Sequence, residues 1–191
     1  KDSIGSAIES VISEFGKIDA LVNNAYPRNS NYKRDVEDAL YTDFCDNLSS
    51  QLGGYFLACQ IFASYFSTLG SGNIVNMGSI YGGITPKFDI YSGTEMRVPI
   101  DYSVIKAGVS HMTRYFAKYY KKHGIRVNTL SPGGVLDNQP SSFLEQYNSR
   151  CGNIGMLKQE HVSNSLVYLL SDLSVGVNGH DVPRFALESM V

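Results

Sequence analysis

Hydrophobic residues in the middle of the chain change from the spacing of buried strands to the spacing of a helix and back again. Two short runs rich in isoleucine and valine, residues 73–77 and 125–130, predict buried parallel strands. The residues that recur between them at steps of three and four, which is helical spacing, are Tyr102, Ile105, Lys106, Val109, Met112 and Phe116. A strand, a helix and a strand in this order predict one right-handed crossover unit of a parallel sheet.

The pattern predicts further elements on both sides of this unit. An amphipathic helix, a buried strand and a long helix precede it, and a shorter amphipathic helix follows it. Their predicted ranges are 3–15, 18–25, 43–68 and 160–170. Strands that alternate with helices define an α/β fold with a parallel sheet. A chain of 191 residues, 43% of them hydrophobic, can bury one core, so we expect residues 1–191 to belong to a single domain.

Residues that could bind or react with a ligand lie where these elements meet. In such sheets small molecules bind beyond the carboxyl ends of the strands. Ser79 and Gly133 come just after the two central strands, and Tyr102 and Lys106 open the helix between them. The last two are four residues apart, so their side chains share one helix face. Because an ammonium group beside a phenol favours the phenolate, we expect the pKa of Tyr102 to lie below its ordinary value and the phenol to act as general acid or base.

Composition and charge argue against several other classes of function. A formal net charge of -2 gives no indication of a nucleic-acid partner or an acidic membrane surface. No apolar run approaches the length of a membrane span, and no histidine, cysteine and aspartate cluster has metal-ligand spacing. The three cysteines lack CxxC spacing, and free thiols in a reducing cytoplasm are the simplest interpretation. We therefore expect a cytoplasmic protein without a metal site.

Five short motifs occur in an order that is typical of one enzyme family. They are LVNNA at 21–25, IVNMGS at 74–79, YSVIKAG at 102–108, IRVNTLSPG at 125–133 and YLLSD at 168–172. With these motifs the chain resembles the classical short-chain dehydrogenases/reductases, whose fold is a Rossmann-type, doubly wound parallel sheet. The turn after LVNNA and the long segment before YSVIKAG resemble members from flagellin-modification and surface-glycan clusters, which act on nucleotide sugars or nonulosonate precursors.

The resemblance implies a role for each matching residue. Tyr102 would be the general acid/base, Lys106 would hold the cofactor ribose and tune the phenol, and Ser79 would bind the substrate oxygen. The family's tetrad asparagine, which holds a proton-relay water, is replaced by Gln51, while Asn47 lies one turn earlier. Cofactor contacts are implied for Asn23, Asn24, Ala25, Met77, Tyr102, Lys106, Pro132, Gly133 and Val135.

Four features depart from the family pattern. The glycine-rich dinucleotide turn, Gly-x-x-x-Gly-x-Gly, occurs nowhere in the sequence, so we expect an incomplete sheet without its N-terminal strands, in a fragment that need not be active alone. Tyr26 replaces the glycine that follows Asn-Asn-Ala in the family. About ten extra residues separate Ser79 from Tyr102 and predict a loop across the mouth of the site. Pro183 falls where a central strand would need an N–H group.

The leading hypothesis is an NAD- or NADP-dependent oxidoreductase that transfers hydride to or from a carbonyl or alcohol, on a sugar or nonulosonate precursor. Two alternatives remain open. One is a non-catalytic Rossmann-type nucleotide-binding or regulatory protein, and the other is a sugar dehydratase or epimerase that uses the same tyrosine and lysine. The expected partners are a small-molecule substrate and identical chains in a dimer or tetramer, without nucleic acid or membrane.

Overall fold

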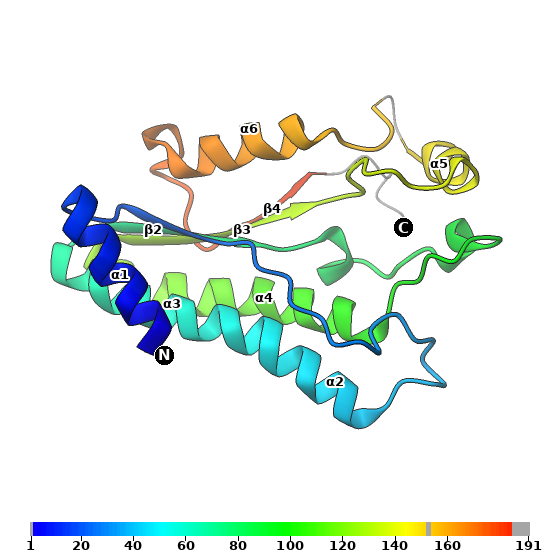
Figure 1. Ribbon diagram of the computed structural model, residues 1–191. Helices are drawn as coiled ribbons and strands as arrows, with labels where there is room; N and C mark the ends of the chain where they lie inside the picture. Colours follow the sequence, from blue (N-terminus) through cyan, green and yellow to red (C-terminus); the bar gives the residue numbers. More distant parts are fainter. Residues whose placement is uncertain (1, 152–153, 185–191) are drawn as a thin grey trace.

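Four parallel strands form the centre of the protein in a computed structural model that describes residues 2–151 and 154–184 (Figure 1). The strands are β1 (Ala20–Asn23), β2 (Gly72–Met77), β3 (Ile125–Pro132) and β4 (Asp181–Arg184). They lie side by side in the order β1-β2-β3-β4, and each neighbouring pair is parallel. The register places Val75 of β2 opposite Val22 of β1 and Asn128 of β3. The parallel sheet predicted from the sequence is confirmed.

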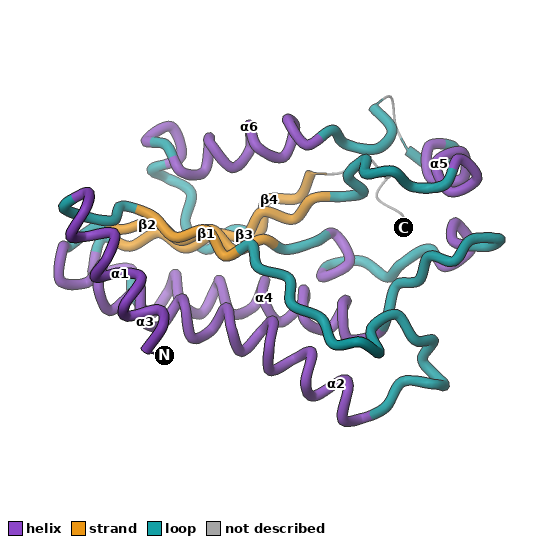
Figure 2. Tube along the Cα trace, in the orientation of Figure 1, coloured by secondary structure: helices purple, strands orange, loops and turns teal. Residues whose placement is uncertain are grey.

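Helices cover both faces of this sheet. In chain order they are α1 (Asp2–Phe15), α2 (Tyr41–Leu48), α3 (Gly54–Leu69), α4 (Ile100–Tyr119), α5 (Ser141–Asn148) and α6 (Gln159–Leu170). The α3 and α4 helices lie along one face and α6 lies along the opposite face, as Figures 1 and 2 show. This is the doubly wound, Rossmann-type arrangement expected from the alternation of strands and helices.

Side chains of β2 alternate between the two faces and tie the sheet to both helix layers. Ile74 packs with Phe66 of α3 and Phe116 of α4, whereas the next residue, Val75, packs with Leu169 of α6. Because both faces of the strand are covered, both positions must be apolar, which explains why Ile74 and Val75 are consecutive in the sequence. Each fully buried side chain of this kind contributes roughly 1.5–3 kcal/mol relative to its exposed state.

The long helix expected at 43–68 is present, with an irregular turn in its middle. A π-helical segment, Ser49–Gly53, joins α2 directly to α3. A π-helical turn holds more residues than an α-helical turn, so it changes which side chains face the neighbouring elements. Within this turn Gln51 is buried, with 3% of its surface exposed.

The segment at 84–99 folds against the chain that follows β3. Ile90 is completely buried and packs with Phe143 and Tyr147 of α5. The carbonyl oxygen of Ser92 accepts a hydrogen bond from Gln146 Nε2 at 3.2 Å. This loop therefore has a small hydrophobic core of its own, which holds it in place beside the end of the sheet.

The β4 strand corrects the expectation that a strand would need an N–H group at Pro183. Pro183 lies opposite Ser131, at the edge of the described sheet. The carbonyl oxygen of His180 accepts from the backbone N–H of Thr129 at 2.8 Å. In a regular parallel ladder with this hydrogen bond, alternate residues of β4 direct their backbone nitrogens toward β3. The nitrogen of Pro183 then points away from β3, so no ladder hydrogen bond is lost.

Candidate active site

A crevice of about 580 Å³ opens at the carboxyl ends of β2 and β3. Ser79 and Tyr102 line it together with Pro132, Gly133 and Val135. Ser79 follows β2 closely, and Tyr102 lies in the first turn of α4. Residues that are distant in the sequence meet here because neighbouring parallel strands end at the same edge of the sheet. The strand, helix and strand expected from the sequence predicted that Ser79, Tyr102 and Gly133 would lie together here.

Lys106 lies one helical turn beyond Tyr102 and is 7% exposed. Its Nζ atom donates a hydrogen bond to the carbonyl oxygen of Met77 at 2.8 Å, and it lies 5.7 Å from the centre of the Tyr102 ring. Burial lowers the pKa of Lys106 to about 8. Since an ammonium group has three N–H donors, Lys106 can hold the end of β2 with one of them and offer the others to a ligand.

The pKa of Tyr102 contradicts the expectation drawn from the Tyr-x-x-x-Lys spacing. Burial disfavours the phenolate and raises the pKa above its ordinary value, and a hydrogen bond with the Ser79 side chain lowers it only in part. The expected lowering is wrong in this structure, because burial is the largest influence on the phenol and acts against its charged form. Tyr102 is therefore protonated near neutral pH and is able to donate its proton.

Tyr26, which replaces the family glycine, packs directly on Tyr102. The two rings meet edge to face, with 5.7 Å between their centres and an interplanar angle of 77°. The Nζ atom of Lys106 lies 5.6 Å from the centre of the Tyr26 ring, and the Cζ atom of Arg28 lies 5.0 Å from it. The hydroxyl groups of Tyr26 and Tyr32 are hydrogen-bonded, which fixes the ring. The sequence predicted only that Tyr26 could alter the conformation of the turn, and it did not predict the contact with Tyr102.

A buried pair of polar side chains fixes the start of α4. Asn47 Nδ2 donates to Asp101 Oδ2 at 2.7 Å, and Asp101 Oδ1 accepts from the backbone N–H of Tyr102 at 3.0 Å. Burial raises the pKa of Asp101, and these two hydrogen bonds lower it in part. The sequence analysis missed Asp101, although an acidic residue in the first turn of a helix is a recognisable signal.

Gln51 is buried but does not line the crevice. Both atoms of its amide, and the hydroxyl of Tyr55 one turn later, are buried without a hydrogen-bond partner in residues 2–151 and 154–184. The Tyr55 ring centre lies 5.7 Å from Lys106 Nζ. An unpartnered buried polar group costs about 1–3 kcal/mol, and ordered water commonly supplies the missing partner.

Asn23 belongs to a chain of hydrogen bonds beneath the crevice. Its Nδ2 donates to Asn76 Oδ1 at 2.8 Å, and Asn76 Nδ2 donates to Thr113 Oγ1 at 2.9 Å. The hydroxyl groups of Thr113 and Thr129 are 2.7 Å apart. These contacts link β1, β2, α4 and β3, so the Asn23 side chain supports the sheet, while the two residues that follow it are exposed.

The described part of the chain shows neither a cluster of metal ligands nor a membrane-spanning helix. In residues 2–151 and 154–184, no three histidine, cysteine, aspartate or glutamate side chains come together as a possible metal site. None of the helices in these ranges has the length and apolar character needed to cross a membrane.

A doubly wound parallel sheet that carries a serine, a tyrosine and a buried lysine at its carboxyl edge defines a Rossmann-type oxidoreductase, and comparisons with known proteins agree. A family model described as enoyl-(acyl carrier protein) reductase matches residues 1–183. Post-translational flagellin modification protein A of Campylobacter coli is 43% identical over 180 residues, which cover 94% of this chain and 70% of the relative.

Two further relatives broaden the comparison. The 2-dehydro-3-deoxy-D-gluconate 5-dehydrogenase of Escherichia coli is 30% identical over 193 residues and covers 95% of this chain and 69% of the relative. A crystal structure of a short-chain dehydrogenase from Leptospira borgpetersenii with bound NAD+ superposes with a TM-score of 0.83 at 31% identity, over 94% of this chain and 68% of the other.

The chain belongs to the short-chain dehydrogenase/reductase family. The family expected from the five ordered motifs is thereby confirmed, and so is the class of activity, an NAD(P)-dependent oxidoreductase that acts on small molecules. What the family does not fix is the substrate, and the departure at Tyr26, which lines the crevice, bears on that question.

Proposed function

We propose that the protein transfers a hydride between a nicotinamide cofactor and a carbinol or carbonyl carbon of a sugar-like substrate. The observation that carries this proposal is the meeting of Ser79, Tyr102 and Lys106 at the carboxyl edge of the sheet. A flagellin modification protein and a dehydrogenase of a sugar acid among the relatives support a sugar-like substrate.

The position of each side chain supports a separate role. Tyr102, protonated near neutral pH, gives its proton to the substrate oxygen during reduction and takes a proton from it during oxidation. The Ser79 hydroxyl, hydrogen-bonded to Tyr102, binds the same oxygen and stabilises negative charge that develops on it. Lys106 places a cation 5.7 Å from the centre of the phenol ring and would hold the ribose of the cofactor.

A nicotinamide cofactor, NAD or NADP, supplies or accepts the hydride when it is bound. The residues present fit its nicotinamide-ribose half, because Lys106 has donors beyond the one given to Met77 and the turn at 132–135 lines the crevice beside Tyr102. We assign the exposed Asn24 and Ala25 to the adenine-ribose side of the cofactor, with Asn23 as their support. The sequence has no glycine-rich pyrophosphate turn, so we assign no residue to the pyrophosphate.

We assign Gln51 the place of the family's asparagine, as the residue that holds a relay water. Its two unpartnered amide atoms and the unpartnered Tyr55 hydroxyl support this role, because all three atoms are buried and the Tyr55 ring centre lies 5.7 Å from Lys106 Nζ. Asn47 suits the role less well, since its amide is already bonded to Asp101 and to the backbone of Asn29. A water held by Gln51 would resupply protons to Tyr102.

The test is turnover of a panel of sugar acids, sugar phosphates and nucleotide sugars with NAD+ and with NADP+, followed by the absorbance of the reduced nicotinamide. On any substrate found, Tyr102→Phe should lower kcat by about 10²–10⁴-fold, the usual contribution of general acid/base catalysis. Gln51→Leu should lower kcat less, with a solvent isotope effect that differs from wild type. Tyr168→Phe, on α6 and away from the crevice, is the matched control.

Three outcomes separate the alternatives. Full turnover in Tyr102→Phe would remove the catalytic role of Tyr102, whereas nucleotide binding without turnover of any compound in the panel would favour a non-catalytic nucleotide-binding protein. Product without net change in reduced nicotinamide would indicate a dehydratase or epimerase. Loss of activity in the Tyr168→Phe control would show that the assay reports folding instead of chemistry.

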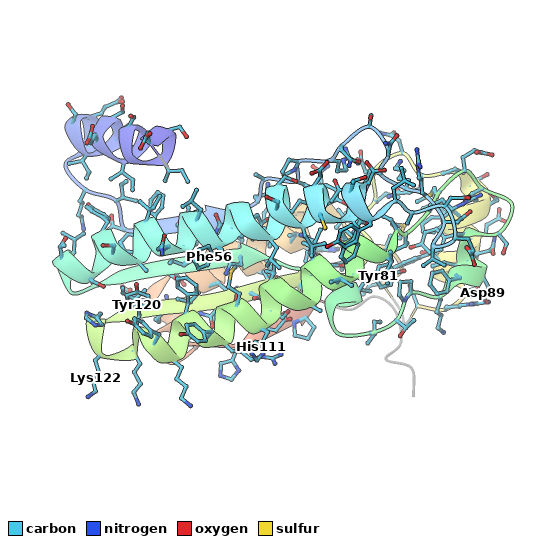
Figure 3. The ribbon with its side chains drawn as sticks, turned by 90° about the horizontal axis from the view of Figure 1, so that it is seen from below. Phe56, Tyr81, Asp89, His111, Tyr120 and Lys122 are labelled. Atoms are coloured by element: carbon cyan, nitrogen blue, oxygen red, sulfur yellow. The ribbon has the colours of Figure 1, made fainter. Side chains whose placement is uncertain are left out.

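We also propose that identical chains associate through the outer surface of α3 and α4. Large apolar side chains are exposed there: Phe56 is 47%, Tyr115 63% and Tyr119 65% exposed. Figure 3 shows Phe56, His111 and Tyr120 on this side of the molecule. A contiguous exposed patch of this kind is typical of a protein interface.

The four described strands form one sheet, which supports the further proposal that residues 1–191 form part of a single domain.

A further inference from the structure

Positively charged side chains outnumber negatively charged ones in the lining of the crevice. Three cationic side chains line it, Arg28, Lys33 and Arg97, against one carboxylate, Asp137. Arg97 is already engaged, because its Nε atom lies 3.3 Å from Asp35 Oδ1 and its Nη1 atom donates to two backbone carbonyls. In the part of the chain that the structure describes, Arg28 and Lys33 form no ion pair within 4.0 Å.

Arg28 is held close to the catalytic tyrosine. Its guanidinium group lies 5.0 Å from the centre of the Tyr26 ring, and that ring in turn contacts Tyr102 at 5.7 Å. Tyr26 therefore contacts both the guanidinium group and the ring of Tyr102. A guanidinium group presents several N–H donors in a planar fork that matches a carboxylate or a phosphate.

Lys33 has an unusual backbone conformation on the same loop. Its φ of 81° is in the left-handed region, which only two non-glycine residues adopt among the residues described. A residue with a long side chain loses about 1–2 kcal/mol in this conformation, and strain of this kind is often found where a loop presents a side chain to a ligand. Lys33 lines the crevice beside Tyr32.

The remaining lining suits a polyhydroxy compound. Tyrosine rings and polar groups surround the crevice, with Tyr81, Tyr91 and Gln139 among them. The hydroxyl groups of Tyr81 and Tyr91 are 2.9 Å apart. Aromatic faces with hydroxyl and amide groups at their edges can contact both the C–H and the O–H groups of a sugar, but they do not neutralise a charge.

We infer that the substrate carries an anionic group, a carboxylate or a phosphate, which Arg28 and Lys33 bind while Tyr102 acts on a carbon of the same molecule. This inference rests on the proposed function and makes it more specific. Tyr26 is the positioning residue of the site, because its ring holds Arg28 and contacts Tyr102 at the same time. The replacement of the family glycine by Tyr26 is thus what brings the cation to the reaction centre.

Calorimetric titration at constant ionic strength tests the inference. The probes are D-gluconate, D-glucose 6-phosphate and neutral D-glucose, each added to the protein with saturating NAD+ and, separately, NADP+. We expect at least one anion to bind wild type at least tenfold more tightly than glucose. The anion that binds more tightly distinguishes a carboxylate site from a phosphate site.

Three variants make the test specific. Arg28→Gln should reduce the preference for the anion at least fivefold, and Arg28→Lys should retain most of it. Arg34→Gln is the matched control, because Arg34 is on the same loop but bonds the backbone of Asp38 and does not line the crevice. Circular dichroism of each variant checks that the fold is intact.

The inference is overturned if glucose binds as tightly as both anions, or if Arg28→Gln keeps the wild-type preference. Since the titration measures binding without turnover, the two proposals fail separately. Anion preference in a protein that catalyses no hydride transfer would leave the charge site standing and remove the proposed oxidoreductase function. Turnover of neutral sugars without anion preference would support the proposed oxidoreductase function and remove the charge site.

Discussion

Replacing the buried lysine of the site should stabilise the protein and remove a distinctive pH dependence. Burial lowers the pKa of Lys106 from its ordinary value of 10.5 to about 8. The difference corresponds to roughly 3 kcal/mol of unfavourable interaction when the group is charged. Below about pH 8 the lysine is protonated in both the folded and the unfolded chain, so the full cost of burying the charge is present.

The sign of the pH dependence follows from proton counting. Above about pH 8 the folded protein releases the proton from Lys106, whereas the unfolded chain keeps it until about pH 10.5, so the unfolded state binds more protons and stability rises with pH. Between pH 7 and pH 9 the gain is about 1 kcal/mol. The Cys59 thiol acts in the opposite direction, because burial raises its pKa to about 12 and the unfolded chain ionises first above about pH 9.

The assay is urea denaturation of wild type and Lys106→Met at pH 7, 8 and 9. We expect the wild-type free energy of unfolding to rise relative to that of the variant by about 1 kcal/mol across this range. The Met77 carbonyl loses its donor in the variant, a cost of about 1–3 kcal/mol that does not change with pH. Cys59 is present in both proteins, so its contribution cancels in the difference.

Lys118→Met, an exposed lysine on the same helix, is the control and should follow wild type at every pH. Parallel curves for wild type and Lys106→Met would refute the argument, because they would mean that the ammonium group is solvated in the folded protein. In that event the donors of Lys106 would be engaged by water, and its assignment as a pre-formed ribose ligand would weaken as well.

Two further predictions concern packing and assembly. Gly82→Ala places a Cβ 2.6 Å from the carbonyl carbon of Lys106 and should lower the free energy of unfolding in urea by about 1–3 kcal/mol. Gly83→Ala is the control, since its nearest neighbouring atom is at 3.7 Å, and it should change the free energy of unfolding by less than about 0.5 kcal/mol. Equal losses in the two variants would contradict the geometry. Light scattering during gel filtration should show a dimer or tetramer for wild type and a smaller species for Tyr115→Lys. The control, Val167→Lys on α6, should keep the wild-type mass. A monomeric wild type would exclude the α3 and α4 interface.

Much of the fold could be predicted because the signals are local. The isoleucine and valine runs, the helical spacing from Tyr102 onward and the order of the motifs place the strands, the crossover and the crevice. Pro183 misled the sequence analysis because a proline is harmful only where its nitrogen faces a neighbouring strand. The sequence does not say which side of β4 faces β3, and the structure decides it.

The electrostatics of the site could not be predicted in the same way. Spacing alone places Lys106 near Tyr102 but does not give the depth of burial, which raises the pKa of Tyr102 and directs the ammonium group to Met77. The contact between Tyr26 and Tyr102 likewise depends on the path of a loop that has no periodic pattern. Both failures concern long-range packing, where desolvation outweighs the local pair interaction.

The unpartnered polar groups of the protein add a thermodynamic argument for the site. Gln51, Tyr55 and Ser131 all have buried polar atoms without partners in the described residues, and Ser131 lies at the carboxyl end of β3. Each such group destabilises the empty fold by about 1–3 kcal/mol, in addition to the buried charge of Lys106. Groups of this kind are retained where ordered water satisfies them, so these three groups indicate water beside the crevice, which none of their side chains lines. A nucleotide that binds only the folded chain should raise its stability by an amount set by the nucleotide concentration and its dissociation constant.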